Sequence, residues 1–171
     1  MPEYRRMTYA YTVDQLQPEL GRVIREHLEA RQLAHALDNV IACCETITDR
    51  VGSSWYDGLP GGAAESLSYL ALIVTPDRLI WARRGDQTPP TAASAAFRDL
   101  RVKVFRPRGT SDFGLDLNFR MENSRWAAVS GRLLLGPEPA AEKFCVALGE
   151  AMGFNLMAPP PKPWWDRLRS R

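Results

Sequence analysis

The sequence has few of the residues from which metal, disulfide and cofactor sites are built. It contains three cysteines and two histidines, and it has no Cys-x-x-Cys pair. Cys43 and Cys44 are adjacent and do not make a disulfide framework, while His27 and His35 are too far apart to bind one metal ion from a single helical face. We therefore expect no metal and no cofactor, and we expect the cysteines to be reduced and buried.

Long apolar runs and an excess of charge of one sign are also missing. No stretch approaches the roughly 20 apolar residues that span a bilayer, and the first residues, MPEYRR, lack the apolar core of a signal peptide. The formal net charge is only +2 over 171 residues, which argues against nucleic acid as a partner. We expect a cytoplasmic protein that is long enough to bury one hydrophobic core.

Recognisable catalytic motifs are absent as well. The sequence has no Ser/His/Asp arrangement in an elbow and no HExxH motif, and the glycines of Asp57–Gly62 lack the lysine and hydroxyl residue that close a phosphate-binding loop. The polar residues of the predicted strands alternate with apolar ones, as on a solvated sheet face. We therefore predict that the protein is not an enzyme.

The strongest positive signal is a β-hairpin at residues 67–84. Two runs of apolar, β-branched and aromatic residues, LSYLALIV and RLIWARR, flank the sequence Thr-Pro-Asp. Pro76 fixes φ for the first corner of a type I turn, and Asp77 suits the second corner. This local chemistry predicts two antiparallel strands.

Further strands are predicted on both sides of the hairpin. They are residues 40–49, 51–56, 100–104, 113–121 and 125–135. The third and fourth alternate cleanly between apolar and polar residues, whereas the first could instead continue a preceding helix. Gly131 is interpreted as a bulge in the last strand. Residues 1–11 show no period, and residues 91–97 are ambiguous.

Two amphipathic helices are predicted, one before the strands and one after them. The first begins at either Thr12 or Pro18 and ends near Leu37, with apolar residues at steps of three to four. It either packs on one side of the domain or pairs with another subunit. The second opens with two prolines and ends at Gly153.

These patterns divide the chain into an N-terminal segment with its helix (1–38), a β-rich domain (39–155) and a Pro-rich tail with Trp and Arg (156–171). Because consecutive strands are joined by short turns, the sheet should be largely antiparallel. The predicted class is α+β, with a bent antiparallel sheet or open barrel closed by the C-terminal helix and an additional N-terminal helix. A helix-grip fold is the alternative.

The segment YLALIVTPDRLIW, at 69–81, resembles the hydrophobic–Thr-Asp-x-Arg-Leu hairpin of bacterial pleckstrin-homology-like (PH-like) and GRAM-like domains. Pro76 stands where that pattern has its aspartate. Residues 97–104 resemble the strand that follows in this family, and residues 140–152 resemble its closing helix. The resemblance covers about 40–153, and it implies a PH-like scaffold that binds a ligand or partner.

Two groups of residues are candidates for binding. Basic residues outnumber acidic ones eight to two between Arg78 and Arg108, and in lipid-binding members of the PH-like superfold such residues near a hairpin take anionic head groups. The candidates for an anionic ligand are Arg83, Arg84, Arg101, Lys103, Arg106 and Arg108. In the tail, the candidates for a partner contact are Trp164, Trp165, Arg167 and Leu168. The two tryptophans could instead pack onto their own domain.

We predict a non-catalytic binding or adaptor module. It would contact a protein partner, or a second copy of itself, through the PH-like scaffold, the first helix and the C-terminal tail. The alternative is peripheral binding of an anionic lipid surface through the basic face of the hairpin, with the tryptophans at headgroup depth.

Overall fold

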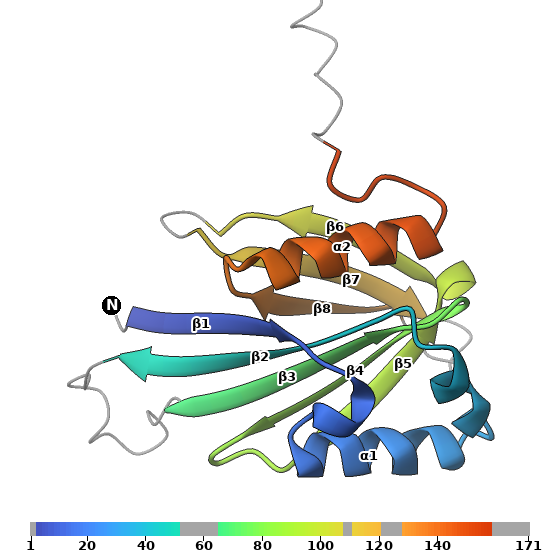
Figure 1. Cartoon of the computed structure of the whole chain (residues 1–171), viewed down its shortest axis with the longest axis horizontal. Helices are drawn as coiled ribbons and strands as arrows, with labels where there is room; N and C mark the ends of the chain where they lie inside the picture. The colour runs from blue at the N-terminus through green and yellow to red at the C-terminus, as the bar shows by residue number, and fades with distance from the viewer. Residues whose placement is uncertain (1–2, 52–64, 108–110, 121–127, 159–171) are drawn as a thin grey trace, which may run out of the picture.

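The computed structural model describes residues 3–51, 65–107, 111–120 and 128–158, which form two antiparallel sheets and two α-helices (Figure 1). The five-stranded sheet consists of β1 (Glu3–Ala10), β2 (Ala42–Val51), β3 (Leu67–Val74), β4 (Arg78–Gly85) and β5 (Thr91–Ala96), in that order. The three-stranded sheet consists of β6 (Leu100–Phe105), β7 (Phe113–Arg120) and β8 (Ala128–Leu135). The predicted α+β class is confirmed, and the two sheets do not close into a barrel.

The predicted hairpin forms as β3 and β4. The strands pair antiparallel from Val74–Leu79 to Ser68–Gly85. At the turn, the N–H of Thr75 donates to the carbonyl of Arg78 at 3.1 Å, and the Thr75 hydroxyl donates to Asp77 Oδ1 at 3.1 Å. The chain therefore turns at Pro76 and Asp77, between β3 and β4, where the sequence predicted a turn.

The first helix, α1 (Pro18–Glu29), begins at the second of the two predicted positions. Pro18 lies in the first turn, where its missing N–H breaks no helical hydrogen bond. The side chain of Gln17 caps this turn, because its Oε1 accepts from the N–H groups of Glu19 at 3.0 Å and Leu20 at 3.1 Å.

The predicted end of this helix, near Leu37, is wrong. The helix ends at Glu29, because Gln32 adopts a left-handed backbone with φ of 59° that a continuing helix does not allow. A separate 3-10 helix, η2 (Ala34–Asn39), follows and carries the chain into β2. The predicted strand at 40–49 accordingly forms as β2, which spans Ala42–Val51, and does not continue the helix.

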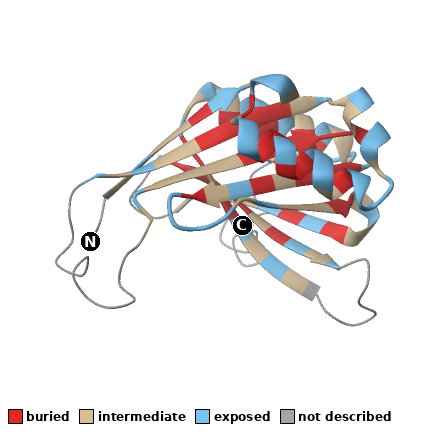
Figure 2. Ribbon diagram, turned by 90° about the horizontal axis from the view of Figure 1, so that it is seen from below, coloured by how far each residue is buried: buried red, intermediate tan, exposed pale blue. Residues whose placement is uncertain are grey.

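The five-stranded sheet is a middle layer with apolar residues on both faces. Its outer face is covered by α1, which lies over β4 and β5, and its inner face is covered by the three-stranded sheet and by α2 (Pro139–Ala151). Figure 2 shows the buried residues running along the strands and helices. The apolar stripe of α1 is therefore used within the domain, as in the first of its two predicted roles.

Each face of the sheet has its own hydrophobic core. The outer core contains Leu20, Val23, Ile24, Leu28, Cys43, Ala71, Ile73 and Ile80. The inner core contains Cys44, Leu72, Val74, Leu79, Leu115, Leu135, Phe144, Cys145 and Leu148. Cys43 and Cys44 point to opposite faces, as the period of a strand predicts. Trp81 of β4 meets Phe119 of β7 edge to face, with ring centroids 5.1 Å apart, and links the two sheets.

Two strands form at positions where no clear residue pattern predicts them. β1 pairs with β2 along its whole length, and its period is hidden because its inner face is polar, with Arg6 and the buried Thr8. β5 is built mainly of alanine, whose small side chain suits the space beneath α1. The predicted bulge at Gly131 is wrong, because β7 and β8 pair in unbroken register through that residue. Most of the predicted strand at 51–56 lies outside the described residues.

Candidate functional site

Five of the six basic residues predicted to bind an anion lie among the described residues, and the structure separates them. Arg83 and Arg84 lie on opposite faces of the five-stranded sheet, because successive strand residues alternate. Nη1 of Arg84 pairs with Glu19 Oε2 of α1 at 2.5 Å, and its guanidinium lies 5.8 Å from the Tyr69 ring centroid. Arg83 is exposed on the inner side. This pair is therefore not a common basic patch.

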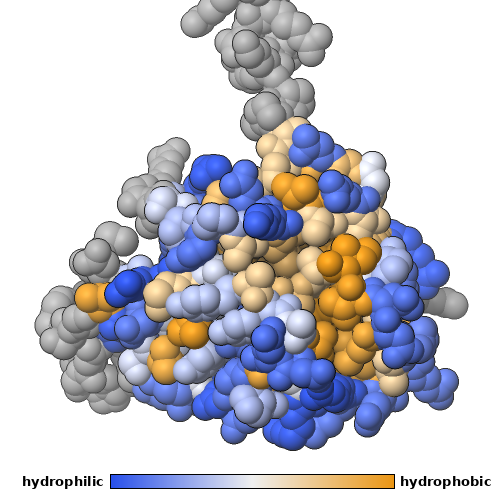
Figure 3. All heavy atoms as spheres, viewed as in Figure 1, coloured by the Kyte–Doolittle hydropathy of each residue, from blue (hydrophilic) through white to orange (hydrophobic). Residues whose placement is uncertain are grey.

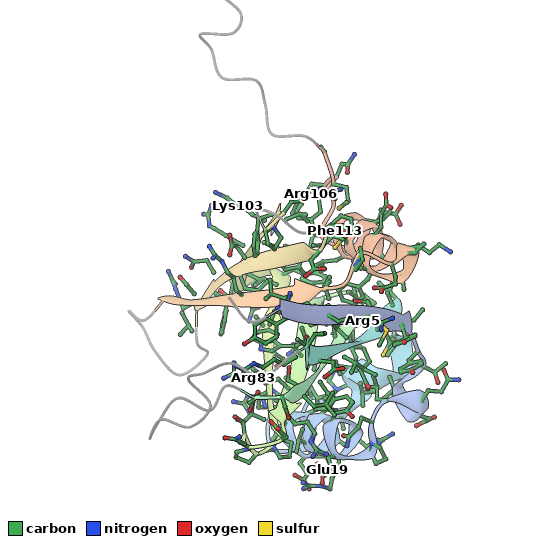
Figure 4. All side chains as sticks on the ribbon, turned by 90° about the vertical axis from the view of Figure 1, so that its left-hand side faces the viewer. Arg5, Glu19, Arg83, Lys103, Arg106 and Phe113 are labelled. Atoms are coloured by element: carbon green, nitrogen blue, oxygen red, sulfur yellow. The ribbon has the colours of Figure 1, made fainter. Side chains whose placement is uncertain are left out.

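Arg101 and Lys103 lie on the outer face of the three-stranded sheet, and Arg106 follows β6 with its guanidinium 4.3 Å from the Phe113 ring centroid. Figure 4 shows Lys103 and Arg106 at the three-stranded sheet and Arg83 well apart from them. The predicted set therefore divides into at least two places, and Arg101 with Lys103 is the part that lies on one open surface.

Strand register brings further basic residues to this surface. In the cross-strand rows, Arg101 lies opposite Asn118 and Lys103 lies opposite Asp116, with β8 continuing each row. We call this surface the basic face and define it by five exposed residues of η4 (Phe97–Asp99), β6, β7 and β8. They are Arg98, Arg101, Lys103, Arg120 and Arg132.

Two of these cations are paired with carboxylates on the same surface. Nε of Arg132 lies 2.7 Å from Asp116 Oδ1, and Nε of Arg98 lies 3.3 Å from Asp99 Oδ2. Within the described part of the chain, the other three members of the basic face have no carboxylate partner. Five cations and two carboxylates leave a local charge of +3, so the surface favours an acidic ligand.

The basic face is broad and shallow. Two depressions of about 570 and 230 Å³ cross it, and both are lined by Arg101 and Asn118. Asn118 and Ser130 add neutral hydrogen-bonding groups, and neither depression is lined by histidine or cysteine among the described residues. This arrangement can bind and orient oxyanions.

Sequence reasoning missed Arg98, Arg120 and Arg132. The alternation of residues 113–121 already placed Arg120 on the polar side of its strand, so that residue could have been found. Arg132 could not, because its position beside Lys103 and Asp116 depends on the pairing register of three strands.

The three cysteines are buried, and His27 is half-buried. Burial raises the pKa of the Cys43 and Cys145 thiols to about 12 and that of Cys44 well above its ordinary value. Nε2 of His27 lies 3.0 Å from the Ser94 hydroxyl, between α1 and β5. Within the described ranges, no three His, Cys, Asp or Glu side chains gather as they would around a metal ion.

Other surfaces are weaker candidates. Figure 3 shows apolar atoms beside α2 and towards the right of the view, on a face that is otherwise mostly hydrophilic. Among the residues that the structure describes, the exposed large apolar side chains are Tyr9, Ile41, Val51, Val146 and Phe154. Single exposed apolar side chains are common on folded proteins. None of the described helices is both long enough and apolar enough to cross a bilayer.

The predicted partner contacts of the tail, Trp164, Trp165, Arg167 and Leu168, lie outside the described residues, as does Arg108. Comparison of the chain with protein-family models, with curated proteins and with solved structures finds no match in any of the three.

Proposed function

We propose that the protein is a non-catalytic binding module on a PH-like scaffold, and that its basic face binds an acidic segment of a protein partner. The observation that carries the proposal is the open surface of β6–β8, where Arg101, Lys103 and Arg120 have no carboxylate partner among the described residues. Cations left unpaired on an exposed sheet favour acidic partners and steer their approach.

The order of elements supports the scaffold part of this proposal. Four antiparallel strands, β2 to β5, precede three more, β6 to β8, and one amphipathic helix, α2, follows and packs against the inner core. This is the order of strands and closing helix that the hairpin resemblance implies. β1, which adds a fifth strand at the edge of the first sheet, and α1, which covers its outer face, are additions to that plan.

Magnitudes indicate how the basic face would contribute. An exposed ion pair contributes roughly 0.2–1 kcal/mol, so three unpaired cations supply at most about 3 kcal/mol. That is enough to speed association and fix orientation, but a lasting complex needs apolar anchors. The predicted anchors are Trp164 and Trp165 of the tail, which would give the partner a second contact.

The test is affinity capture from the native host with three full-length proteins, followed by titration of each captured partner in purified form. The first is the wild type, and the second carries Arg101→Gln, Lys103→Gln and Arg120→Gln. The third is a charge-matched control with Arg5→Gln, Arg22→Gln and Arg25→Gln, which are exposed on β1 and α1. We expect the wild type and control to bind the same acidic partner, and the second protein to lose it.

Two further measurements, a salt series and a test of lipid binding, distinguish the acidic-partner proposal from its alternatives. Binding through the basic face should weaken steadily as NaCl is raised from 50 to 500 mM, because exposed charges are screened. Equal binding by all three proteins would overturn the proposal. Binding of the wild type, but not the triple variant of the basic face, to phosphatidylserine vesicles with no protein captured would favour the anionic-lipid alternative instead.

A further inference from the structure

A cleft of about 410 Å³ opens between the inner face of the five-stranded sheet and strand β8. Its walls come from β1, β2, β3 and β4 on one side and from residues 132–134 of β8 on the other. It lies towards the ends at which β1 starts and β4 finishes (Figure 1). Arg132 of the basic face borders this cleft, but none of the three unpaired cations of that face, Arg101, Lys103 and Arg120, lines it.

The inner face of the sheet changes from apolar to polar as it reaches this cleft. Along β2 the inward residues run from Cys44 to Thr48, and along β3 they run from Leu72 to Ser68. On β4 the inward residue after Trp81 is Arg83. A face built only to pack against the second sheet would continue apolar, so these residues form the wall of a hydrated or ligand-filled space.

Arg83 is the unpaired cation of the cleft. The other arginines of the lining are each held by a carboxylate: Arg6 by Asp112, Arg84 by Glu19 and Arg132 by Asp116. Within the described ranges, Arg83 has no such partner, and it remains exposed. Its guanidinium can therefore take an oxyanion from a ligand without breaking an existing ion pair.

Glu65 supplies the opposite charge in the same cleft. Its Oε1 atom is buried and, in the described structure, accepts no hydrogen bond. Gly85 makes room for this carboxylate, because a Cβ at that position would collide with it. Gly85 lies only two residues beyond Arg83 on β4, so the free cation and the unpartnered acceptor share one wall. A buried acceptor without a donor is costly unless a ligand or ion satisfies it.

We propose that this cleft binds a small zwitterion, an amino acid or short peptide, whose carboxylate pairs with Arg83 and whose ammonium group donates to Glu65. Thr48, Ser68 and Thr88 also line the cleft, and each carries a hydroxyl group that can donate or accept a hydrogen bond. Its volume falls in the range of roughly 300–1,000 Å³ that is usual for small-molecule sites. The inference goes beyond the proposed function, because the cleft is lined by none of the three unpaired cations on which that function depends.

The test is a binding screen of the full-length protein by thermal shift and isothermal titration calorimetry. The probes are the standard L-amino acids and a set of dipeptides. Each binder is compared with its N-acetyl derivative, which lacks the ammonium, and with its carboxamide, which lacks the carboxylate. We expect binders whose affinity falls roughly tenfold or more on either modification, because each removes a charge-assisted hydrogen bond.

Variants assign the binding to the cleft. Arg83→Gln should weaken the binders roughly tenfold or more and remove their preference over the carboxamide, and Glu65→Gln should remove the preference over the N-acetyl derivative. Arg101→Gln, on the basic face, is the matched control and should bind normally. The proposal is overturned if no zwitterion binds at millimolar concentration, if derivatives bind as well as their parents, or if a correctly folded Arg83→Gln variant binds unchanged.

Discussion

Nη1 of Arg6 donates a hydrogen bond to Oδ2 of Asp112 at 2.6 Å. Because Arg6 lies in β1 and Asp112 immediately precedes β7, this ion pair connects the two sheets. The two side chains are 12% and 10% exposed. Nearby, the N–H of Gly136 donates to the Thr8 hydroxyl at 2.8 Å, and the N–H of Thr8 donates to Glu138 Oε2 at 2.8 Å. Polar contacts of β1 thus fasten the first strand to the second sheet.

The largely buried ion pair predicts a large loss of stability when one partner is removed. Asp112→Ala would leave the Arg6 guanidinium buried without its carboxylate, and we expect the free energy of unfolding to fall by about 3 kcal/mol in a urea titration. Asp116→Ala is the matched control, because its pair with Arg132 is exposed and should change stability by less than about 1 kcal/mol. Equal losses of stability in the two variants would show that the Arg6–Asp112 ion pair does not stabilise the fold more than the exposed Arg132–Asp116 pair does.

Replacement by alanine should have opposite effects on stability at Gly149 and at Gly131. In α2, helix propensity favours Gly149→Ala by about 1 kcal/mol. However, the new Cβ would lie 2.7 Å from the carbonyl oxygen of Phe154 and 2.8 Å from the nitrogen of Leu156. We therefore expect a net loss of roughly 1–3 kcal/mol, because backbone must move. At Gly131 nothing lies within 4 Å of the new Cβ, so Gly131→Ala should be neutral or stabilising by up to about 1 kcal/mol.

Urea titrations of both glycine variants check this pair, with hydrogen exchange to confirm that α2 is retained. A stabilised Gly149→Ala protein would show that the segment after α2 is free to move aside. Both substitutions add the same methyl group, so the difference between the two variants reports how closely the surrounding atoms pack around each glycine.

Local chemistry explains which elements could be predicted. The hairpin at 67–84 and the alternation at 113–121 depend on neighbouring residues, so the β3–β4 hairpin and the strand β7 were both predicted. β1 was missed because it places Arg6 and Thr8 on its inner face, where other strands place apolar residues. Their partners, Asp112 and Thr46, lie far away in sequence, so no local pattern reveals the strand.

The candidate sites depend on the pairing of strands distant in sequence to a greater degree than the individual strands do. Arg101 and Lys103 could be placed on one face from their spacing alone, but Arg132 joins them only through the register of β6, β7 and β8. The grouping of Arg83 with Arg84 followed from adjacency, and the sheet sends them to opposite faces. The cleft beside Arg83 exists only because the two sheets meet at β8.

Glu45 predicts a specific dependence of stability on pH. This carboxyl is 3% exposed on the outer face of β2, and burial raises its pKa above the ordinary 4.5, although an N–H of Gln17 donates to its Oε2 at 2.8 Å. The folded state therefore binds a proton more tightly than the unfolded state does. Its stabilising contribution is present below pH 4.5 and is lost as pH rises through the folded pKa.

Glu45→Gln removes this titration while keeping an acceptor for Gln17. We expect the stability of the variant relative to wild type to increase as pH rises above about 4.5 and then to level off. Urea titrations of both proteins from pH 4 to 8 measure the difference, in which the other carboxyl groups cancel. A difference that stays constant across this range would show that Glu45 does not titrate differently in the folded protein.

The three cysteines predict the order in which the two cores open. All are buried, and their raised pKa values keep them as thiols, so the native protein should react slowly with a thiol reagent at pH 8. Cys43 lies in the outer core beneath α1, whereas Cys44 and Cys145 lie in the inner core between the sheets.

The outer core opens when α1 alone leaves the sheet, whereas the inner core opens only when the two sheets and α2 separate. Release of this one 12-residue helix exposes less apolar surface. In urea below the unfolding midpoint, pulse labelling read by mass spectrometry should therefore modify Cys43 first. Simultaneous labelling of all three would instead make the two cores one cooperative unit.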